Sequence, residues 1–447
     1  MSLDSSAPGQ LGSAEERRGG ARPIDEATRR TALFDDAGLS RGRDGRLQLE
    51  GISLQDIAGE TGTPAYIYNA EAIRRRFREL TGALSGLSHR IDYAVKANSC
   101  RRVLEVLQQL GAGCDIVSVG ELRRVLAAGF SANRVVFSGV GKRPDELEAA
   151  MESRIGQINL ESIEELEVIA SLAGKIGGSP ARVGIRVNPD VTVETHPYTR
   201  TAMAAAKFGI PADQVVEVAR RIGQHRQLTL VGLAMHVGSQ VLDPAPFVQG
   251  AKRLAELYAV LRSQGIDSID SVDLGGGLGI RYNAETPLAP ARLVDAIRPI
   301  LASLGITIRI EPGRFLVGSA GVLLATVLYR KHAGGTDYVV VDTGMNDLER
   351  PSRYQAHHEI VAVADQGRPE RLVDIVGPIC ESGDFLALGR MLPGVESGEV
   401  LAILGAGAYG FVMSSNYNDR PRPPEIMIDG GGWSVARARE TLEDLMR

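Results

Sequence analysis

The sequence contains few of the residues that build covalently cross-linked or metal-stabilised scaffolds. Its 447 residues include three cysteines, Cys100, Cys114 and Cys380, and none stands in a CxxC or Cys/His spacing that would close a zinc site. An odd number of cysteines argues against a disulfide framework, so we expect a reducing cytoplasm. HExxH and comparable spacings are also absent, and we expect no metal.

The chain also lacks a large net charge of either sign. The net charge is -5 and 44% of the residues are hydrophobic, as in a soluble globular protein with a large core. Neither a nucleic acid nor a membrane is therefore expected as a partner. The length favours two or three domains, or one barrel of about 250 residues joined to a second domain.

Lysine is rare, since nearly all of the 50 basic residues are arginines. The lysines are Lys96, Lys142, Lys175, Lys207, Lys252 and Lys331. This bias makes each retained lysine informative. Lys96 stands in "IDYAVKANSC", between an alternating apolar run and a polar turn.

Short apolar segments rich in β-branched residues recur through the middle of the chain. They are "IDYAVKA", "CDIVS", "VVFSG", "QINLES", "RVGIRV", "LVGLAMHVG", "SVDLGGG" and "TIRIEPG". Amphipathic segments that end at glycine lie between them, as expected for helices. Eight such alternations predict an eight-stranded parallel (β/α)8 barrel. The alternative is a doubly wound open sheet, which should stop nearer six strands and carry a GxGxxG turn.

The flanking segments differ from this pattern. Residues 1–30 are rich in Ser, Gly, Ala and Arg and lack an apolar run long enough for a signal or membrane helix, so we expect a disordered tail. Residues 31–69 are expected to add strands to a β domain, and residues 70–315 to form the barrel. Residues 316–447 show strand-like runs without long helices, which predicts a separate C-terminal β domain.

The active site of such a barrel lies at the carboxyl ends of its strands. Lys96 is placed there, and desolvation could lower its pKa enough for it to form an imine. The glycines of "DLGGGLGI" offer backbone N–H groups to a phosphate. Glu311 of "EPGR" could keep a pyridine nitrogen protonated, and His236 could cover a ring face. Together these groups point to pyridoxal 5'-phosphate.

A family resemblance supports the same cofactor. The motifs that carry it come in one order over roughly residues 60 to 430. They include "YAVKANS", "CDIVSVGEL", "HVGSQ", "DLGGGLGI", "EPGRFLVGSAG", "VDTGMNDLERP", "GPICESGDFLA" and "GAYGFVMSSNYNDRPRPPE". In these motifs the chain resembles the diaminopimelate decarboxylases. The resemblance implies a pyridoxal-phosphate barrel joined to a β domain, and the decarboxylation of meso-2,6-diaminopimelate to L-lysine and CO2.

The resemblance also implies cofactor contacts. Lys96 would bind the cofactor covalently, His236 would stack on its ring, and Glu311 would pair with the pyridine nitrogen. The phosphate would be held by Ser239, Gly276, Gly277, Gly313 and Arg314 of "EPGR", and Tyr409. Two further assignments stay open from the residues alone. Asp115 either orients Lys96 or caps the next helix, and Arg186 either contacts the cofactor or supports strand packing.

Substrate contacts follow from the same resemblance. Arg314, Arg350 and Tyr354 would bind substrate carboxylates and Glu381 a substrate amine, and Tyr409 would also contact the substrate. Cys380 would act as an acid or a gate near the reacting carbon. Cys380 and Glu381 would cross the interface of a homodimer. Arg350 favours diaminopimelate over ornithine, because a second carboxylate suits a bidentate guanidinium.

Two loops depart from the family pattern. Arg353 and His357 replace an apolar and an aromatic residue within 352–358, and three alanines occupy 204–206 within the loop 199–206. Both loops could shift substrate preference. Surface or structural roles are expected for the remaining histidines, which are His196, His225, His332, His357 and His358.

Two other functions compete with this hypothesis. An amino-acid racemase of similar architecture needs an arginine at the pyridine nitrogen, and Glu311 argues against it. A non-catalytic cofactor carrier or pseudoenzyme would bind the cofactor without turnover, but both Lys96 and Cys380 are present.

Overall fold

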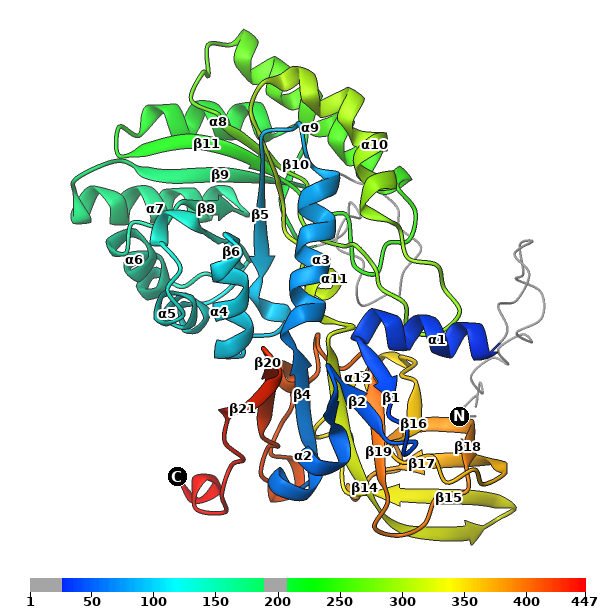
Figure 1. Cartoon of the computed structure of the whole chain (residues 1–447). Helices are drawn as coiled ribbons and strands as arrows, with labels where there is room; N and C mark the ends of the chain where they lie inside the picture. The colour runs from blue at the N-terminus through cyan, green and yellow to red at the C-terminus, as the bar shows by residue number, and fades with distance from the viewer. Residues whose placement is uncertain (1–25, 189–206) are drawn as a thin grey trace, which may run out of the picture.

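The computed structural model describes residues 26–188 and 207–447 and contains a β/α barrel and a β-sheet domain (Figure 1). Helix α1 spans Glu26–Ala37. The prediction of a disordered tail over residues 1–30 is therefore wrong for residues 26–30. The reason is tertiary: Leu33 and Ala37 are buried, and the guanidinium of Arg29 lies 2.7 Å from Glu359. Residues 1–25 lie outside the described part of the chain.

All eight predicted barrel strands are present. They are β5 (His89–Ala94), β6 (Gly113–Ile116), β7 (Val135–Phe137), β8 (Gln157–Leu160), β9 (Ala181–Asn188), β11 (Leu228–Ala234), β12 (Ser271–Asp273) and β13 (Thr307–Ile310). Their order is β9-β11-β12-β13-β5-β6-β7-β8, and pairing of β8 with β9 closes the barrel. The eight pairings are parallel, and a short strand β10 (Ile210–Pro211) extends β9. The closed barrel, not the open sheet, is confirmed.

Helices cover the outside of this barrel (Figure 1). They are α3 (Ala70–Ala83), α4 (Arg101–Gln109), α5 (Val119–Ala127), α6 (Pro144–Glu152), α7 (Ile163–Ile176), α8 (Val215–Gln224), α9 (Ala245–Ser263) and α10 (Pro290–Leu301). Ser118 and Ser162 cap the N-termini of α5 and α7. Helix α4 buries Val103, Leu104 and Leu107 against the barrel, and each such side chain contributes about 1.5–3 kcal/mol.

The second domain is a sheet with strand order β18-β17-β15-β14-β4-β20-β21, to which β16 and β19 attach. Its strands are β4 (Ala65–Asn69), β14 (Gly321–Ala333), β15 (Thr336–Val341), β16 (Ile360–Ala362), β17 (Glu370–Val376), β18 (Phe385–Pro393), β19 (Val400–Leu404), β20 (Glu425–Asp429) and β21 (Gly432–Arg437). Strand β4, which precedes the barrel in sequence, pairs with β14 and β20. The N-terminal segment therefore belongs to the β domain in space.

The rest of the N-terminal segment forms a small unit on this domain. Strands β1 (Leu39–Arg41), β2 (Leu47–Leu49) and β3 (Ile52–Ser53) make a three-stranded sheet, followed by helix α2 (Leu54–Thr61). Leu47 and Leu49 are fully buried and share an apolar cluster with Val363 and Ile426. Within the described ranges, no helix combines the length and apolar character needed to cross a bilayer.

Candidate active site

Lys96 and Asp115 form the centre of the site. Lys96 lies in a 3₁₀ turn directly after β5, and Asp115 lies in the neighbouring strand β6. The Lys96 Nζ donates to Asp115 Oδ2 at 2.5 Å. The cap of the following helix is Ser118, whose Oγ accepts from the Glu121 N–H at 3.2 Å. Asp115 therefore pairs with Lys96, and the side chain that caps α5 is Ser118.

The protonation of Lys96 differs from the prediction. Burial alone would lower the pKa of Lys96, but the charges of Asp115 and then Glu311 raise it above its ordinary value. The predicted depression of this pKa is therefore wrong, because an anion on the next strand outweighs desolvation. The ammonium form is favoured at neutral pH.

Glu311 supplies a buried carboxyl group directly after β13. Its backbone N–H donates to Gly275 O at 2.9 Å, which ties it to the glycine turn. Burial and the charges of Asp115 and Asp273 raise the pKa of Glu311 well above its ordinary value. A cationic partner would therefore be needed to hold this group as a carboxylate.

The glycine turn allows several backbone segments to meet. A Cβ on Gly276 would lie 2.3 Å from Glu311 O, and one on Gly277 would lie 2.6 Å from Gly238 O. Gly277 also has a φ of +118°. The Gly276 N–H donates to His236 Nδ1 at 3.1 Å, while burial and the charges of Arg186 and Lys96 lower the pKa of His236 well below its ordinary value. His236 is thus a neutral ring beside a turn without side chains.

Arg314 contacts two other residues that were predicted to hold the phosphate, Ser239 and Tyr409. Its Nη2 donates to Ser239 Oγ at 3.1 Å, and its guanidinium carbon lies 4.8 Å from the Tyr409 ring centroid. Its Nε is buried and has no hydrogen-bond partner among the described residues. Gly313 precedes it, and a Cβ there would lie 2.9 Å from Ala97 Cβ. This cluster therefore lies against the turn that carries Lys96.

Arg350 is held by two residues that the sequence did not single out as functional. Its Nη1 donates to His358 Nε2 at 2.8 Å, and its guanidinium carbon lies 4.4 Å from the Tyr282 ring centroid. His358 is buried and donates from Nδ1 to Leu404 O at 2.8 Å. The Tyr282 hydroxyl also accepts from Arg314 Nη1 at 2.7 Å. Tyr282 therefore brings Arg314 and Arg350 together.

Arg186 and Tyr354 lie within the described residues as well. Arg186 Nη1 donates to Glu161 Oε1 at 2.6 Å, and its guanidinium carbon lies 4.9 Å from the Phe208 ring centroid. These two contacts hold the Arg186 side chain near the end of β9, and its charge lowers the pKa of His236. Tyr354 is half-buried at the end of helix α12 (Arg350–Tyr354).

The arrangement fits pyridoxal phosphate. It offers a reactive amine, a buried acid whose charge acts on that amine, a glycine turn without side chains, and an unpartnered buried donor at Arg314 Nε. Asp115 Oδ1 is a matching buried acceptor without a partner in the described chain. A phosphorylated pyridine aldehyde uses each of these groups.

Comparisons with known proteins agree with this fit. The family model for the pyridoxal-binding domain of pyridoxal-dependent decarboxylases matches residues 70–318. The diaminopimelate decarboxylase of Pseudomonas aeruginosa is 46% identical over 403 residues, which cover 90% of this chain and 96% of that protein. That of Aquifex aeolicus is 44% identical over 402 residues, which cover 90% and 95%. This chain belongs to the diaminopimelate decarboxylase family.

Solved structures extend the match to three dimensions. The crystal structure of diaminopimelate decarboxylase from Helicobacter pylori complexed with L-lysine superposes with a TM-score of 0.85 at 38% identity, covering 88% of this chain and 98% of that one. A crystal structure from Aquifex aeolicus gives 0.86 at 41% identity, covering 93% and 98%. The family fold therefore extends through both domains of this chain.

Cys380 and Glu381 contact a different set of residues from those of the Lys96 site. Cys380 is exposed, and its backbone N–H donates to Asn418 Oδ1 at 2.9 Å. Glu381 is exposed too, and its hydrogen bond with Tyr417 raises the pKa of that tyrosine. The structure thus places Cys380 next to Asn418 and Glu381 next to Tyr417.

The altered loops can be placed in part. Arg353 is exposed and pairs with Glu349 at 3.0 Å, while His357 accepts from Arg390 Nη1 at 2.7 Å. Arg350 remains in the buried cluster described above. The loop 199–206 and His196 lie outside the described residues.

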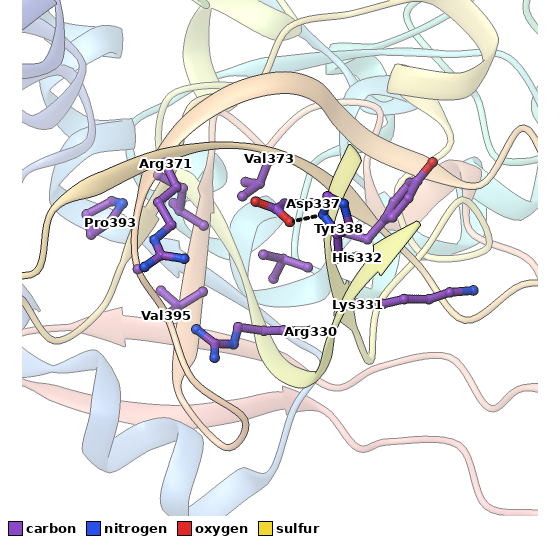
Figure 2. Close-up of a pocket in the computed structure, with 12 residues that line it drawn as sticks. Arg330, Lys331, His332, Asp337, Tyr338, Arg371, Val373, Pro393 and Val395 are labelled. Atoms are coloured by element: carbon purple, nitrogen blue, oxygen red, sulfur yellow. Dashed lines mark hydrogen bonds and ion pairs between the residues drawn. The ribbon is translucent and has the colours of Figure 1, made fainter. Parts of the chain in front are cut away.

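Two cavities differ in relevance to the decarboxylase site. One of about 400 Å³ opens beside Lys96, and it is lined by Lys96, Ser99, Glu121, Arg124, Phe411, Val412, Met413, Arg422 and Arg437. The other, of about 250 Å³, lies between the β14–β15 hairpin and strands β17 and β18 (Figure 2). It includes the His332–Asp337 pair at 2.6 Å and none of the predicted site residues.

Proposed function

We propose that the protein is a pyridoxal-phosphate-dependent carboxy-lyase that converts meso-2,6-diaminopimelate to L-lysine and CO2, the last step of bacterial lysine biosynthesis. The observation that carries the proposal is the Lys96–Asp115 pair at 2.5 Å, in the electric field of the buried Glu311. Membership of the family, with relatives of that name at 46% and 44% identity, supports the substrate.

The cofactor contacts are assigned to named groups. Lys96 binds it covalently, Asp115 orients that lysine, and Glu311 faces the pyridine nitrogen. The ring and phosphate contacts come from Arg186, His236, Ser239, Gly276, Gly277, Gly313, Arg314 and Tyr409. When bound, pyridoxal phosphate supplies the electron sink that accepts the electrons of the bond to the departing carboxylate.

The protein groups control charge and orientation around this reaction. Asp115 holds the Lys96 ammonium in place until the proton leaves it. His236 stays neutral because burial and the nearby charges of Arg186 and Lys96 lower its pKa. Its ring therefore adds bulk that excludes water and adds no charge at the reacting carbon.

Substrate recognition is assigned to the arginine cluster. Arg350 and Arg314 share the Tyr282 ring, and Arg350 is buried. Neither guanidinium has a carboxylate partner among the described residues, and such a pair suits a dicarboxylic amino acid better than a diamine. Tyr354 and Tyr409 complete the carboxylate contacts, and Glu381 binds the distal amine.

The site is completed by a second copy of the chain. Cys380 and Glu381 are exposed in the single chain, and their hydrogen-bonded neighbours are Asn418 and Tyr417. We assign them to the site of the partner in a homodimer, where Cys380 returns a proton to the α-carbon. A cytoplasmic location is part of the same proposal, since Cys380 has to stay reduced.

One assay tests this function. The purified protein, supplied with pyridoxal phosphate, is incubated separately with meso-diaminopimelate, L-ornithine and L-lysine, and the evolved CO2 is measured. Gas and L-lysine are expected from meso-diaminopimelate alone. Cofactor binding without CO2 from any of the three would instead support a carrier or pseudoenzyme. Epimerisation without CO2 would support a racemase.

A further inference from the structure

Asp384 is a buried carboxyl group to which the proposed function gives no role. It is 5% exposed and ends the loop between β17 and β18, residues 377–384, which we call the Cys380 loop. Its Oδ2 accepts from the Ile379 N–H at 2.6 Å, directly before Cys380. Its Oδ1 accepts from the Met345 N–H at 2.6 Å. One carboxylate therefore joins the Cys380 loop to a second segment of the β domain.

This second segment leads into the helix that carries Arg350. It spans residues 342–349, between β15 and α12, and we call it the Arg350 segment. A Cβ on Gly344 of this segment would lie 2.6 Å from Asp384 Oδ1, and one on Gly377 of the Cys380 loop would lie 2.5 Å from Gly344 Cα. The two segments therefore meet through their backbones, and no side chain between them could absorb a shift of either one.

A second contact joins α12 itself to the Cys380 loop. Ser352 lies in α12, two residues after Arg350, and its Oγ donates to Gly383 O at 2.7 Å. Gly383 directly precedes Asp384. The helix that begins at Arg350 is thus connected to the Cys380 loop by this hydrogen bond as well as by the two that Asp384 accepts.

The two ends of this connection serve different active sites in the proposed homodimer. Arg350 lies over the Tyr282 ring, and the Tyr282 hydroxyl accepts from Arg314 at 2.7 Å, so Arg350 belongs to the site of its own chain. Cys380 is exposed and is assigned to the site of the partner subunit. This step rests on the proposed function, which supplies both assignments.

We propose that Asp384 is a positioning residue that fixes Arg350 for the site of its own chain and Cys380 for the site of the partner subunit. Its two carboxylate oxygens hold one backbone N–H from each segment, and hydrogen bonds to an ionised acceptor are among the stronger ones. The Ser352–Gly383 hydrogen bond supports the same arrangement. Loss of the carboxylate therefore acts on two sites in different ways.

Mixed dimers separate the two effects. Asp384→Asn keeps the size of the side chain but turns one acceptor oxygen into an amide that faces a backbone N–H. A Lys96→Ala chain is paired with a chain that keeps Lys96, and a different affinity tag on each chain isolates the mixed dimer. Only one site can then act, and it takes Lys96 and Arg350 from the second chain and Cys380 from the Lys96→Ala chain.

The expected result depends on which chain carries Asp384→Asn. In the chain that supplies Cys380, the substitution should lower kcat for CO2 release about tenfold and leave KM for meso-diaminopimelate within about twofold. In the chain that supplies Arg350, it should raise KM about tenfold and leave kcat within about twofold. Asp374→Asn is the matched control, because Asp374 Oδ1 accepts from the Gly389 N–H at 2.7 Å, and it should change neither constant.

The same changes in kcat and KM whichever chain carries Asp384→Asn would overturn the proposal, because a merely structural role acts on both arrangements alike. Unchanged constants in both arrangements would overturn it too. Should Asp384→Asn chains fail a circular-dichroism check of folding, Ser352→Ala takes their place and has to show the same split between kcat and KM. An unsubstituted protein that releases no CO2 from meso-diaminopimelate would instead overturn the proposed function, and this proposal with it.

Discussion

The Nζ atom of Lys96 lies 2.5 Å from the Oδ2 atom of Asp115. Strands β5 and β6 run in parallel with Ala94 opposite Asp115, so a residue two positions after Ala94 reaches back to that carboxylate. The contact therefore follows from strand register. It sets the charge of the amine on which the proposed chemistry depends.

Asp115→Asn should lower the pKa of Lys96. Burial already acts to lower this pKa, and Asp115 is the main group that raises it, so removal of its charge shifts the balance downward. The measurement is the pH dependence of reductive methylation of Lys96 in the cofactor-free protein. Lys252 is exposed and serves as an internal control that should not change. An unchanged or higher Lys96 pKa in the variant would contradict the assigned pairing.

Arg350→Lys should impair substrate binding and leave cofactor binding intact. Lysine cannot donate to His358 and also present a planar fork to a carboxylate. The loss of one charge-assisted hydrogen bond, about 1.5–3 kcal/mol, predicts a KM for meso-diaminopimelate that is roughly 10- to 100-fold higher. Arg353→Lys is the matched control, since Arg353 is exposed and pairs with Glu349. Equal effects of the two substitutions would remove Arg350 from the substrate site.

Glu359→Gln should destabilise the protein by about 3 kcal/mol at neutral pH. Glu359 is 4% exposed and pairs with Arg29 and Arg30 of α1, and a buried cation that loses its partner is costly. Burial acts to raise the pKa of Glu359, but the neighbouring His357, the hydrogen bond from Arg29 and nearby positive charge lower it to about 2. Its contribution is therefore complete above the unfolded pKa of about 4.3 and is lost as the pH falls through about 2.

Denaturant unfolding of both proteins between pH 7 and pH 2 measures this difference. The gap in unfolding free energy should be constant down to about pH 5 and close toward pH 2. Glu399→Gln breaks an ion pair with Arg368 that is nearer the surface, and it should cost at most about 1 kcal/mol. A difference in unfolding free energy that does not depend on pH would show that the charge of Glu359 does not stabilise the packing of α1.

Cys380→Ala should lower turnover far more than cofactor binding. The thiol is exposed in the single chain, and we assign it to the site of a partner copy. Mixing Lys96→Ala with Cys380→Ala chains should therefore restore activity, because one site of each mixed dimer regains both residues. Two inactive variants that stay inactive after subunit exchange would contradict a shared site.

The barrel could be predicted because its signals are local. Each strand is a short apolar run, and Ser118 and Ser162 cap two of the helices between the strands. Barrel strands that are neighbours in the chain also pair with each other, and the pairing of the last strand with the first closes the barrel. Lys96 was identifiable for the same reason, since a rare lysine follows a strand in a fold whose site lies at strand ends.

The parts that could not be predicted depend on contacts between distant residues. Helix α1 is held by Glu359, 330 residues from Arg29, and nothing in residues 26–30 indicates that partner. The Lys96 pKa was predicted in the wrong direction because its sign depends on Asp115 and Glu311 from other strands. The roles of Tyr282 and His358 likewise depend on Arg350, which comes from the β domain.

The most direct test of the account is the site of covalent attachment. The protein loaded with pyridoxal phosphate is reduced with borohydride, digested, and mapped by mass spectrometry. The pyridoxyl group is expected on the peptide that contains Lys96, and Lys96→Ala should lose both that adduct and the visible absorbance of the bound cofactor. Modification of Lys142, Lys207 or another lysine in its place, or a cofactor that stays bound and visible in Lys96→Ala, would contradict the account.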